Sequence, residues 1–255
     1  MSDKIIVILS GGLDSTTLVY DYKAAGFDID CVSFDYGQRH VTELSYAART
    51  CEKLDLRHDI VAMNSITRLL AESGSSLISD TPVPEGHYAE ENMKATVVPN
   101  RNMIMQSIAL GIAVARNANF IATAVHAGDH AIYPDCRPEF YVPFNYAAWR
   151  ANEGFGNLDE PNYLKHSGPV RTPYIEQTKA DIATNAFLLG VPLEDTWSCY
   201  QGGSKHCGRC GTCVERLEAI QDAQNRLWEG GAGKDYQDNT EYEDNEYWKE
   251  ALGHV

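Results

Sequence analysis

The amino-acid sequence predicts an α/β fold, a doubly wound parallel sheet of the Rossmann-like type followed by a small C-terminal helical region. Three observations predict it. Short apolar runs alternate with amphipathic stretches along most of the chain, which is typical of βαβ units. A glycine pair, Gly11 and Gly12, follows the first apolar run. With 255 residues and 44% hydrophobic content, the chain can bury one sizeable core.

The elements follow from the same patterns in chain order. The apolar runs predicted as strands cover residues 5–9, 29–34, 57–62 and 120–125. The amphipathic stretches predicted as helices begin at Asp14 and then cover residues 41–54, 103–115, 140–150 and 175–189. Gly190 and Pro192 end the last of these. Residues 64–99 are rich in glycine and proline, and so long a loop inside a compact domain is usually functional or a lid.

The chain is expected to divide into three parts. Residues 1–192 form the nucleotide-binding α/β domain, and residues 193–228 form a metal-binding region with an amphipathic helix. Residues 229–255 form a tail that carries eight acidic residues against Lys234 and Lys249. A solvated tail is the default expectation. The alternative is docking on the body or on a second subunit through the aromatic residues Tyr236, Tyr242, Tyr247 and Trp248.

Charge and hydropathy exclude several classes of protein. The net charge of -15 opposes non-specific attraction to DNA or RNA, so no direct nucleic-acid partner is expected. The apolar run at residues 5–9 is too short for a signal peptide, and residues 103–115 are too short and too polar to span a bilayer. We therefore expect a cytoplasmic protein without a membrane partner. Its seven cysteines are better explained by thiols and metal than by disulfides.

The segment after the first strand has the character of an anion-binding loop. Residues 10–17 read Ser-Gly-Gly-Leu-Asp-Ser-Thr-Thr. Free backbone N–H groups, the helix dipole and these hydroxyls would bind pyrophosphate without a lysine. A Walker A loop needs a lysine after its second glycine, and none occurs here before Lys23, so a P-loop kinase or GTPase is disfavoured. A glycine turn without a ligand is the less favoured alternative.

The cysteines near the C-terminus have metal-ligand spacing. They are Cys199, Cys207, Cys210 and Cys213, with glycines between them. Zinc holds four thiolates tetrahedrally, and a closed shell leaves no position for water, so the site is expected to be structural. An iron–sulfur cluster is the competing interpretation. His206 is expected to be an exposed neighbour, with replacement of one cysteine ligand as the alternative.

Three further segments make the pattern more specific. Residues 34–40 read Phe-Asp-Tyr-Gly-Gln-Arg-His, residues 98–102 read Val-Pro-Asn-Arg-Asn, and residues 133–137 read Tyr-Pro-Asp-Cys-Arg. With the loop and the four cysteines, they resemble the 7-cyano-7-deazaguanine synthase family of PP-loop ATP pyrophosphatases, whose fold is adenine nucleotide alpha hydrolase-like. The resemblance runs from Ile5 to about Arg216 and leaves out the acidic tail.

This resemblance implies an ATP-dependent ligase that forms carbon–nitrogen bonds in queuosine-type biosynthesis. The implied substrates are 7-carboxy-7-deazaguanine, ammonia and two ATP, with AMP and pyrophosphate released twice. A carboxylate is a poor electrophile until its oxygen joins an AMP leaving group. The resulting amide needs the same activation before it becomes a nitrile. The resemblance also implies a homodimer, structural zinc and magnesium with the ATP.

The family's ATP segment maps onto consecutive residues of the first loop and helix. These are Leu9, Ser10, Gly11, Gly12, Leu13, Asp14, Ser15, Thr16, Thr17, Leu18 and Val19. Asp14 and Ser15 are expected to act in catalysis at the phosphates or the magnesium, with helix capping as the alternative for Asp14. The departing pyrophosphate needs cations, and the candidates are Lys179, Arg101 and Arg39. A surface salt bridge is the alternative for each. Arg39 is also assigned to substrate binding.

The substrate residues are expected downstream of the fourth strand. Asp135 suits the amidine-like edge of the base, because one carboxylate accepts from both the ring N–H and the exocyclic amine. The alternative is a turn in which Asp135 caps its own backbone. Arg137 is assigned to the substrate carboxylate, Tyr133 to stacking, and His126 to base contact or proton transfer. Cys136 is disfavoured as a covalent catalyst because AMP already supplies the leaving group.

Three rival functions stay open. A tRNA-thiolating relative would pair the same loop with a reactive cysteine and a basic surface. A relative that joins a deazaguanine acid to a protein amine would share these motifs. A non-enzymatic zinc-knuckle module would not need the intact loop at residues 10–17.

Overall fold

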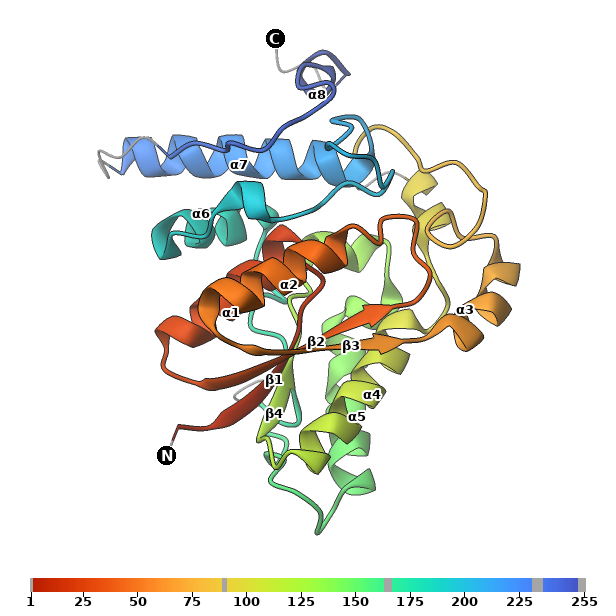
Figure 1. Cartoon of the computed structure of the whole chain (residues 1–255), viewed down its shortest axis with the longest axis vertical. Helices are drawn as coiled ribbons and strands as arrows, with labels where there is room; N and C mark the ends of the chain where they lie inside the picture. Colours follow the sequence, from red (N-terminus) through yellow and green to blue (C-terminus); the bar gives the residue numbers. More distant parts are fainter. Residues whose placement is uncertain (1, 89–90, 163–166, 231–235, 252–255) are drawn as a thin grey trace.

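The protein is described by a computed structural model that covers residues 2–88, 91–162, 167–230 and 236–251. Its centre is a five-stranded sheet in the order β3-β2-β1-β4-β5, and every neighbouring pair is parallel (Figure 1). The strands are β1 (Lys4–Ile8), β2 (Asp28–Asp35), β3 (Arg57–Ala62), β4 (Phe120–Ala122) and β5 (Val170–Arg171). The strand order reverses at β1, which confirms the predicted doubly wound α/β fold.

Helices cover both faces of this sheet. On one face, Ile5 and Val7 pack with α1 (Leu13–Ala24), α2 (Glu43–Leu54) and α6 (Lys179–Leu189). On the other face, Ile6 packs with α4 (Arg101–Ala115) and α5 (Pro138–Ala151). Successive residues of β1 point to opposite faces, so its buried run is continuously apolar.

A further layer lies beyond α6. Helix α7 (Gly211–Glu229) crosses over α6, and the short α8 (Tyr247–Ala251) lies above α7 in Figure 1. Ala183 and Ala186 of α6 pack against Ala219 and Ala223 of α7. Their small side chains let the two helices approach closely.

Some predicted boundaries were wrong. The supposedly irregular segment contains α3 (Asn64–Leu70) and the 3-10 turns Ala71–Ser73 and Glu91–Thr96. Helix α6 begins at Lys179 instead of residue 175, because Thr178 and Asp181 form a capping box there. Strand β4 has only three residues, all of which pair with β1, and its other partner β5 has two. The remaining short elements are the 3-10 turns Ala127–Ala131, Pro134–Cys136 and Leu193–Asp195.

The expectation of a solvated tail is wrong for the described residues 236–249, and the docking alternative is confirmed for the body of the same chain. Trp248 is 7% exposed, and the Tyr242 ring lies 5.4 Å from that of His206. A Cβ atom at Gly208 would lie 1.5 Å from the carbonyl oxygen of Asp244, so the tail contacts the cysteine loop directly. Lys234 lies outside the described residues. The division at residues 192 and 228 stays a prediction.

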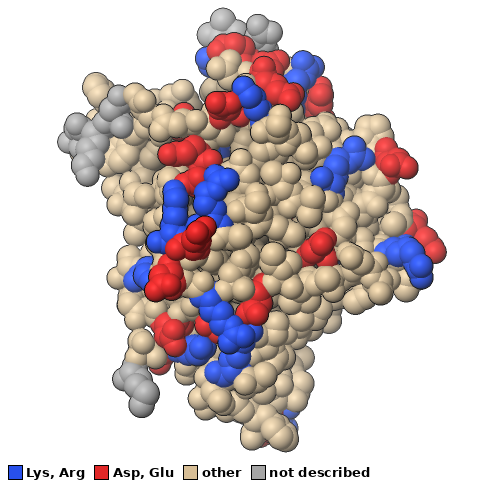
Figure 2. Space-filling view, in the orientation of Figure 1, with Lys and Arg blue, Asp and Glu red and all other residues tan. Residues whose placement is uncertain are grey.

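The surface agrees with the acidic balance of the chain. On the face shown in Figure 2, the described lysines and arginines are interspersed with aspartates and glutamates and do not form a continuous basic surface. Within the described part of the chain, no helix combines the length and apolarity that a bilayer crossing requires.

Candidate active site

The predicted loop opens onto a cavity of about 230 Å³ at the carboxyl ends of β1 and β4. This is the point where the strand order reverses, and such crevices hold the ligands of open α/β sheets. The cavity is also lined by the starts of α2, α4, α6 and α7. Segments far apart in the sequence therefore converge on one site.

The loop conformation depends on Gly11. Its φ angle is +89°, and a Cβ atom there would lie 2.3 Å from the carbonyl oxygen of Glu43. Its own carbonyl accepts a hydrogen bond from the backbone N–H of Trp197 at 2.8 Å. Gly12 has an ordinary φ of -75° and acts as the N-cap of α1. Only the first glycine of the pair is thus required by conformation and by close approach.

The hydroxyls of Ser10 and Ser15 stabilise the conformation of the loop. Ser10 Oγ and Ser15 Oγ lie 2.9 Å apart, and Ser10 Oγ accepts from the N–H of Gly12 at 3.2 Å. Of the predicted ATP segment, the residues that line the cavity are Leu9, Ser10, Gly12, Leu13, Asp14 and Ser15. Thr17 does not: its hydroxyl donates to the carbonyl of Leu13 at 2.7 Å. Leu18 and Val19 are buried in the core.

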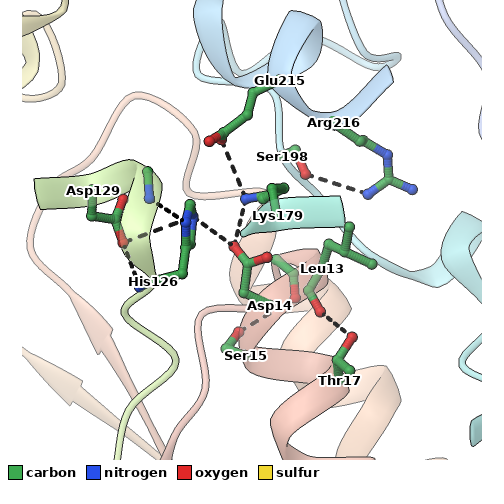
Figure 3. A network of polar contacts seen from close by, with 12 residues as sticks. Leu13, Asp14, Ser15, Thr17, His126, Asp129, Lys179, Ser198, Glu215 and Arg216 are labelled. Atoms are coloured by element: carbon green, nitrogen blue, oxygen red, sulfur yellow. Dashed lines mark hydrogen bonds and ion pairs between the residues drawn. The ribbon is translucent and has the colours of Figure 1, made fainter. Parts of the chain in front are cut away.

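Asp14 is paired across the cavity and does not cap its helix. Its Oδ2 lies 2.6 Å from Lys179 Nζ, which also lies 3.4 Å from Glu215 Oε2 (Figure 3). Burial alone would raise the pKa of Asp14, but the charges of Lys179, His126 and Arg216 and the hydrogen bond from Lys179 together outweigh burial and lower that pKa. The other oxygen, Oδ1, is buried without a hydrogen-bond partner among the described residues. Asp14 therefore has one oxygen available for a ligand.

His126 and Asp129 stand beside this pair. His126 Nε2 lies 3.9 Å from Asp14 Oδ2 and 3.8 Å from Asp129 Oδ2. Its Nδ1 accepts from the N–H of Gly128 at 3.1 Å, so the neutral ring carries its proton on Nε2, toward the carboxylates. Tyr88 donates to Asp129 Oδ1 at 3.1 Å.

Glu215 was not predicted. It lies in the first turns of α7, just beyond the last cysteine of the cluster, and folding brings it to Lys179. Burial raises its pKa, and the charge of Lys179 opposes that rise. Nothing in its local sequence distinguishes it from a helix-surface glutamate. We call Asp14, His126, Asp129, Lys179 and Glu215 the acidic group.

A second set of side chains lies around Arg101. The guanidinium carbon is 5.7 Å from the ring centre of Tyr36 and 5.6 Å from that of Tyr133. Arg101 forms no salt bridge with a described carboxylate; its Nη1 instead donates to the Tyr36 hydroxyl at 3.3 Å. Tyr200 completes the lining. We call Tyr36, Arg101, Tyr133 and Tyr200 the tyrosine group.

Three residues assigned to the substrate do not line the cavity. Arg39 is exposed and donates to the carbonyls of Ser79 and Thr81 at 2.8 and 3.2 Å. Arg137 Nε donates to the carbonyl of His130 at 2.7 Å. These guanidiniums stabilise loops, and we remove both from the substrate site.

Asp135 also has a structural partner. It accepts from the backbone N–H of Asn102 at 3.2 Å and from its Nδ2 at 3.1 Å, so it caps α4 from outside. Neither base recognition nor a turn around its own backbone describes this geometry. Asp135 is likewise removed from the substrate site.

Cys136 does line the cavity but is a weak nucleophile. It is 2% exposed, and burial raises the pKa of its thiol. The Nδ2 of Asn102 lies 3.1 Å from its sulfur. The thiolate is the reactive form of cysteine, so this environment agrees with the expectation that Cys136 is not a covalent catalyst.

The four predicted cysteines form a group that can hold a metal ion. The sulfurs of Cys199, Cys207, Cys210 and Cys213 all lie within 4.8 Å of one another. Cys199, Cys210 and Cys213 are fully buried, whereas Cys207 is partly exposed. Backbone N–H groups of Cys210 and Arg209 point at the Cys207 sulfur, at 3.3 and 3.4 Å. Such donors stabilise thiolates.

His206 is not the exposed neighbour that was expected. It is 2% exposed, and its Nε2 accepts from the N–H of Ser198 at 3.0 Å. Its ring centre lies 4.5 Å from that of Trp197. Burial lowers its pKa to about 3. His206 thus joins the cysteine loop to the core as a neutral aromatic side chain.

The fold and the loop define a class, the nucleotide-binding α/β proteins with a phosphate loop after the first strand. Comparison with known proteins narrows this class to one family. The family described as "Queuosine biosynthesis protein QueC" matches residues 4–224, and the chain belongs to that family.

Named relatives match over nearly the whole chain. The 7-cyano-7-deazaguanine synthases of Allorhizobium ampelinum and Rhizobium johnstonii are 46% and 47% identical, over 97% and 98% of this chain and 96% of each relative. The enzyme of that name from Ruegeria pomeroyi is 47% identical over 98% of both chains. The NMN synthetase of Francisella tularensis aligns over 99% of this chain and 86% of that structure at 14% identity, and its TM-score of 0.45 adds nothing to the assignment.

Proposed function

We propose that this chain converts 7-carboxy-7-deazaguanine and ammonia into 7-cyano-7-deazaguanine, with two ATP cleaved to AMP and pyrophosphate. The family membership and the named relatives support the reaction. The observation that carries the proposal is the cavity itself. The loop hydroxyls, the acidic group and the tyrosine group line one space, so a triphosphate and a carboxylated base can meet there.

The acidic group is suited to the triphosphate and a divalent cation. Three carboxylates face one lysine and a histidine, and Asp14 Oδ1 is buried without a hydrogen-bond partner in the described part of the chain. Oxygen ligands of this kind suit magnesium, which would neutralise charge on the phosphates. Lys179 is positioned to stabilise the departing pyrophosphate, and the charges of Asp14 and Glu215 raise its pKa despite burial and keep it protonated.

The tyrosine group is suited to a planar acid. Arg101 lacks a carboxylate partner among the described side chains, so its guanidinium group is available to bind the substrate carboxylate. This role was first assigned to Arg137. The Tyr133 hydroxyl lies 2.6 Å from Thr96 Oγ1, which leaves its ring for stacking. The carboxylate oxygen would then be held for attack on the innermost phosphorus of ATP.

The test is mass spectrometry of the incubated base together with nucleotide analysis. We expect the acid to become the amide and then the nitrile, with one AMP released per step. Magnesium-dependent exchange between pyrophosphate and ATP should require the acid. ADP release, tRNA thiolation or attachment of the base to a protein amine would instead replace this proposal by one of its rivals.

We propose that the four cysteines hold one zinc ion as a structural site. Tetrahedral thiolate shells are typical of structural zinc, and the surrounding N–H donors fit them. We expect one zinc per chain by elemental analysis and a colourless protein. Cys213→Ser should release the zinc and lower the melting temperature, whereas Cys51→Ser, away from the cluster, should keep the zinc. A brown protein containing iron would contradict the zinc assignment.

A cytoplasmic location and a homodimer belong to the same proposal, and so does the absence of a nucleic-acid partner. The acidic balance of the chain supports the last of these. Sedimentation of the purified protein with and without tRNA tests both the dimer and the nucleic-acid expectation.

A further inference from the structure

Glu43 is a buried carboxyl group that the proposed chemistry does not yet use. It is the first residue of α2, is 9% exposed and lines the cavity. Its backbone carbonyl is the atom that excludes a side chain at Gly11, so Glu43 lies directly against the phosphate loop. Glu43 therefore lies beside the phosphate loop in the cavity that is proposed to hold the triphosphate and the base.

Two neighbours fix the orientation of Glu43. Gln38 Nε2 donates to Glu43 Oε1 at 2.9 Å, while Gln38 Oε1 accepts from the N–H of Tyr36 at 2.9 Å. His40 Nε2 lies 3.5 Å from the same Oε1. Both contacts use one oxygen, and Oε2 has no hydrogen-bond partner among the described residues. Glu43 is thus held by one oxygen and has the other available.

The charged and titratable surroundings of Glu43 come from separate elements. Arg101 of α4 acts on it electrostatically, Tyr36 lies at the end of β2, and His40 precedes α2. Burial lowers the pKa of His40 to about 3, so this ring is neutral. His40 Nδ1 is itself buried without a hydrogen-bond partner among the described residues. Gln38 and His40 are positioning residues for the carboxyl group.

Resting on the proposed function, we propose that Glu43 is the base that removes protons from the attacking nitrogen. In the first round, the ammonia lone pair forms a C–N bond to the adenylated carbonyl carbon, and an N–H proton passes to the Glu43 carboxylate. The C–O bond to AMP then breaks, and its electron pair leaves with AMP. The amide forms and Glu43 returns the proton to water.

The second round also needs a base that removes an N–H proton. The amide oxygen displaces pyrophosphate from a second ATP, and Glu43 takes an N–H proton from the resulting imidate. The electron pair of the broken N–H bond forms the third bond between carbon and nitrogen, while the electron pair of the C–O bond leaves with AMP. The remaining N–H proton then passes to water. One base beside the reacting carbon thus serves both rounds.

Burial raises the pKa of Glu43 to about 8. A base of this kind is well matched to chemistry near neutral pH. The base form increases as the pH rises toward 8. The rate with ammonia, divided by the concentration of free ammonia, should therefore rise with pH, reach half of its maximum near pH 8 and level off above that. Hydroxylamine is already unprotonated near neutral pH and a better nucleophile, so its rate should depend little on Glu43.

The experiment compares Glu43→Gln with Glu43→Asp and the control Glu52→Gln, which changes an exposed residue of the same helix. Gln at position 43 keeps an oxygen for Gln38. We expect Glu43→Gln to keep acid-dependent exchange of pyrophosphate into ATP and hydroxamate formation within about 2-fold of wild type. Amide and nitrile formation from ammonia should fall by on the order of 100-fold or more. Glu43→Asp should recover part of this loss, and Glu52→Gln should match wild type.

Two results overturn the role of Glu43 alone. One is nitrile formation by Glu43→Gln at nearly the wild-type rate. The other is loss of exchange in parallel with amide formation, which would make Glu43 a binding or structural residue. If Glu43→Gln does not fold, a wild-type ammonia profile without an ionisation near pH 8 overturns the proposal. Absence of acid-dependent exchange in the wild-type protein would instead overturn the proposed function and this role with it.

Discussion

Arg101 and Arg216 both lie in the interior of the protein, but their guanidinium groups have different kinds of partners. Arg216 is fully buried, and its donors reach Thr196 at 2.7 Å, the Leu193 carbonyl at 2.9 Å and the Tyr242 hydroxyl at 2.9 Å. Asp238 lies 3.5 Å away and completes the set. Arg101 instead lies among tyrosine rings with no carboxylate partner in the described chain.

The difference separates structure from function. A buried guanidinium with satisfied donors belongs to the framework, because its bonds already offset the cost of burying a charge. A guanidinium without a counter-ion in a cavity retains donors for a ligand. Asp14 Oδ1 and His40 Nδ1 of the cavity lining are buried without a hydrogen-bond partner among the described residues, whereas Arg216 joins the tail to α7 through several bonds.

The largest expected effect is on stability, from Arg216→Met. The change leaves Asp238 and several buried acceptors without their donor, so the free energy of unfolding should fall by about 3–5 kcal/mol. Urea unfolding followed by circular dichroism measures it. Arg226→Met is the matched control, because Arg226 lies on the same helix and pairs with Asp181 and Asp222 at the surface. Its loss should cost less than about 1 kcal/mol. Equal losses would contradict the contrast.

Lys179→Met should affect catalysis most. Removal of the cation leaves Asp14 and Glu215 facing each other and takes a positive charge from the departing pyrophosphate. Pyrophosphate exchange should fall by about 10²–10³-fold. Lys53→Met, which removes an exposed lysine paired with Asp195, should leave the exchange rate unchanged. A Lys179 variant with normal exchange would remove this residue from the mechanism.

Arg101→Met sharpens the comparison with Arg216 directly. We expect kcat/KM for the acid to fall by on the order of 100-fold, because a charge-assisted bidentate contact is lost. Stability should change far less than in Arg216→Met. Arg39→Met, outside the cavity, should leave KM near the wild-type value. A larger effect at Arg39 than at Arg101 would contradict the assignment of Arg101 to the substrate carboxylate.

The remaining prediction is a pH dependence of stability at Glu43. Its pKa is about 8 in the folded protein and 4.5 in a free side chain, so the folded state binds the proton more tightly. Wild-type stability should therefore fall relative to Glu43→Gln as the pH rises from 4.5 to 8. The slope is at most about 1.4 kcal/mol per pH unit. Parallel stability curves for the two proteins would contradict the raised pKa.

The strands and helices were largely predictable because they depend on local pattern. Strand β3 was predicted at its observed bounds, and β1 and β2 within one residue. The apolar runs of β1 and β2 are buried, whereas β3 is a partly exposed edge strand. Helix α3 was missed because its few residues stand at the start of a segment that is otherwise rich in glycine and proline. The start of α6 was misplaced, because the capping box at Thr178 outweighs the apolar pattern that begins at Ile175.

The candidate site was predicted where one segment supplies it and missed where several do. Loop residues 10–15 and the four cysteines lie close in sequence, so their spacing carries the information. Asp135 and Arg137 occupy a motif beside the site, but which way a side chain points depends on its neighbour across the fold. In the structure Asp135 accepts a hydrogen bond from Asn102, and Arg137 donates one to the His130 carbonyl. Nothing in the sequence around Glu215 pointed to the site, whereas Glu43 lies shortly after the motif at residues 34–40.

The sequence by itself determined the class of fold, the anion-binding loop, the thiolate site and the family, because each depends on residue type and short-range spacing. Tertiary structure decided which polar groups are satisfied and which remain available. The sequence indicated a role for Arg101 but not the partners of Arg216, which come from the tail and from Leu193 and Thr196. Hydrogen-bond satisfaction is a property of groups brought together from distant segments, so spacing along the chain cannot specify it.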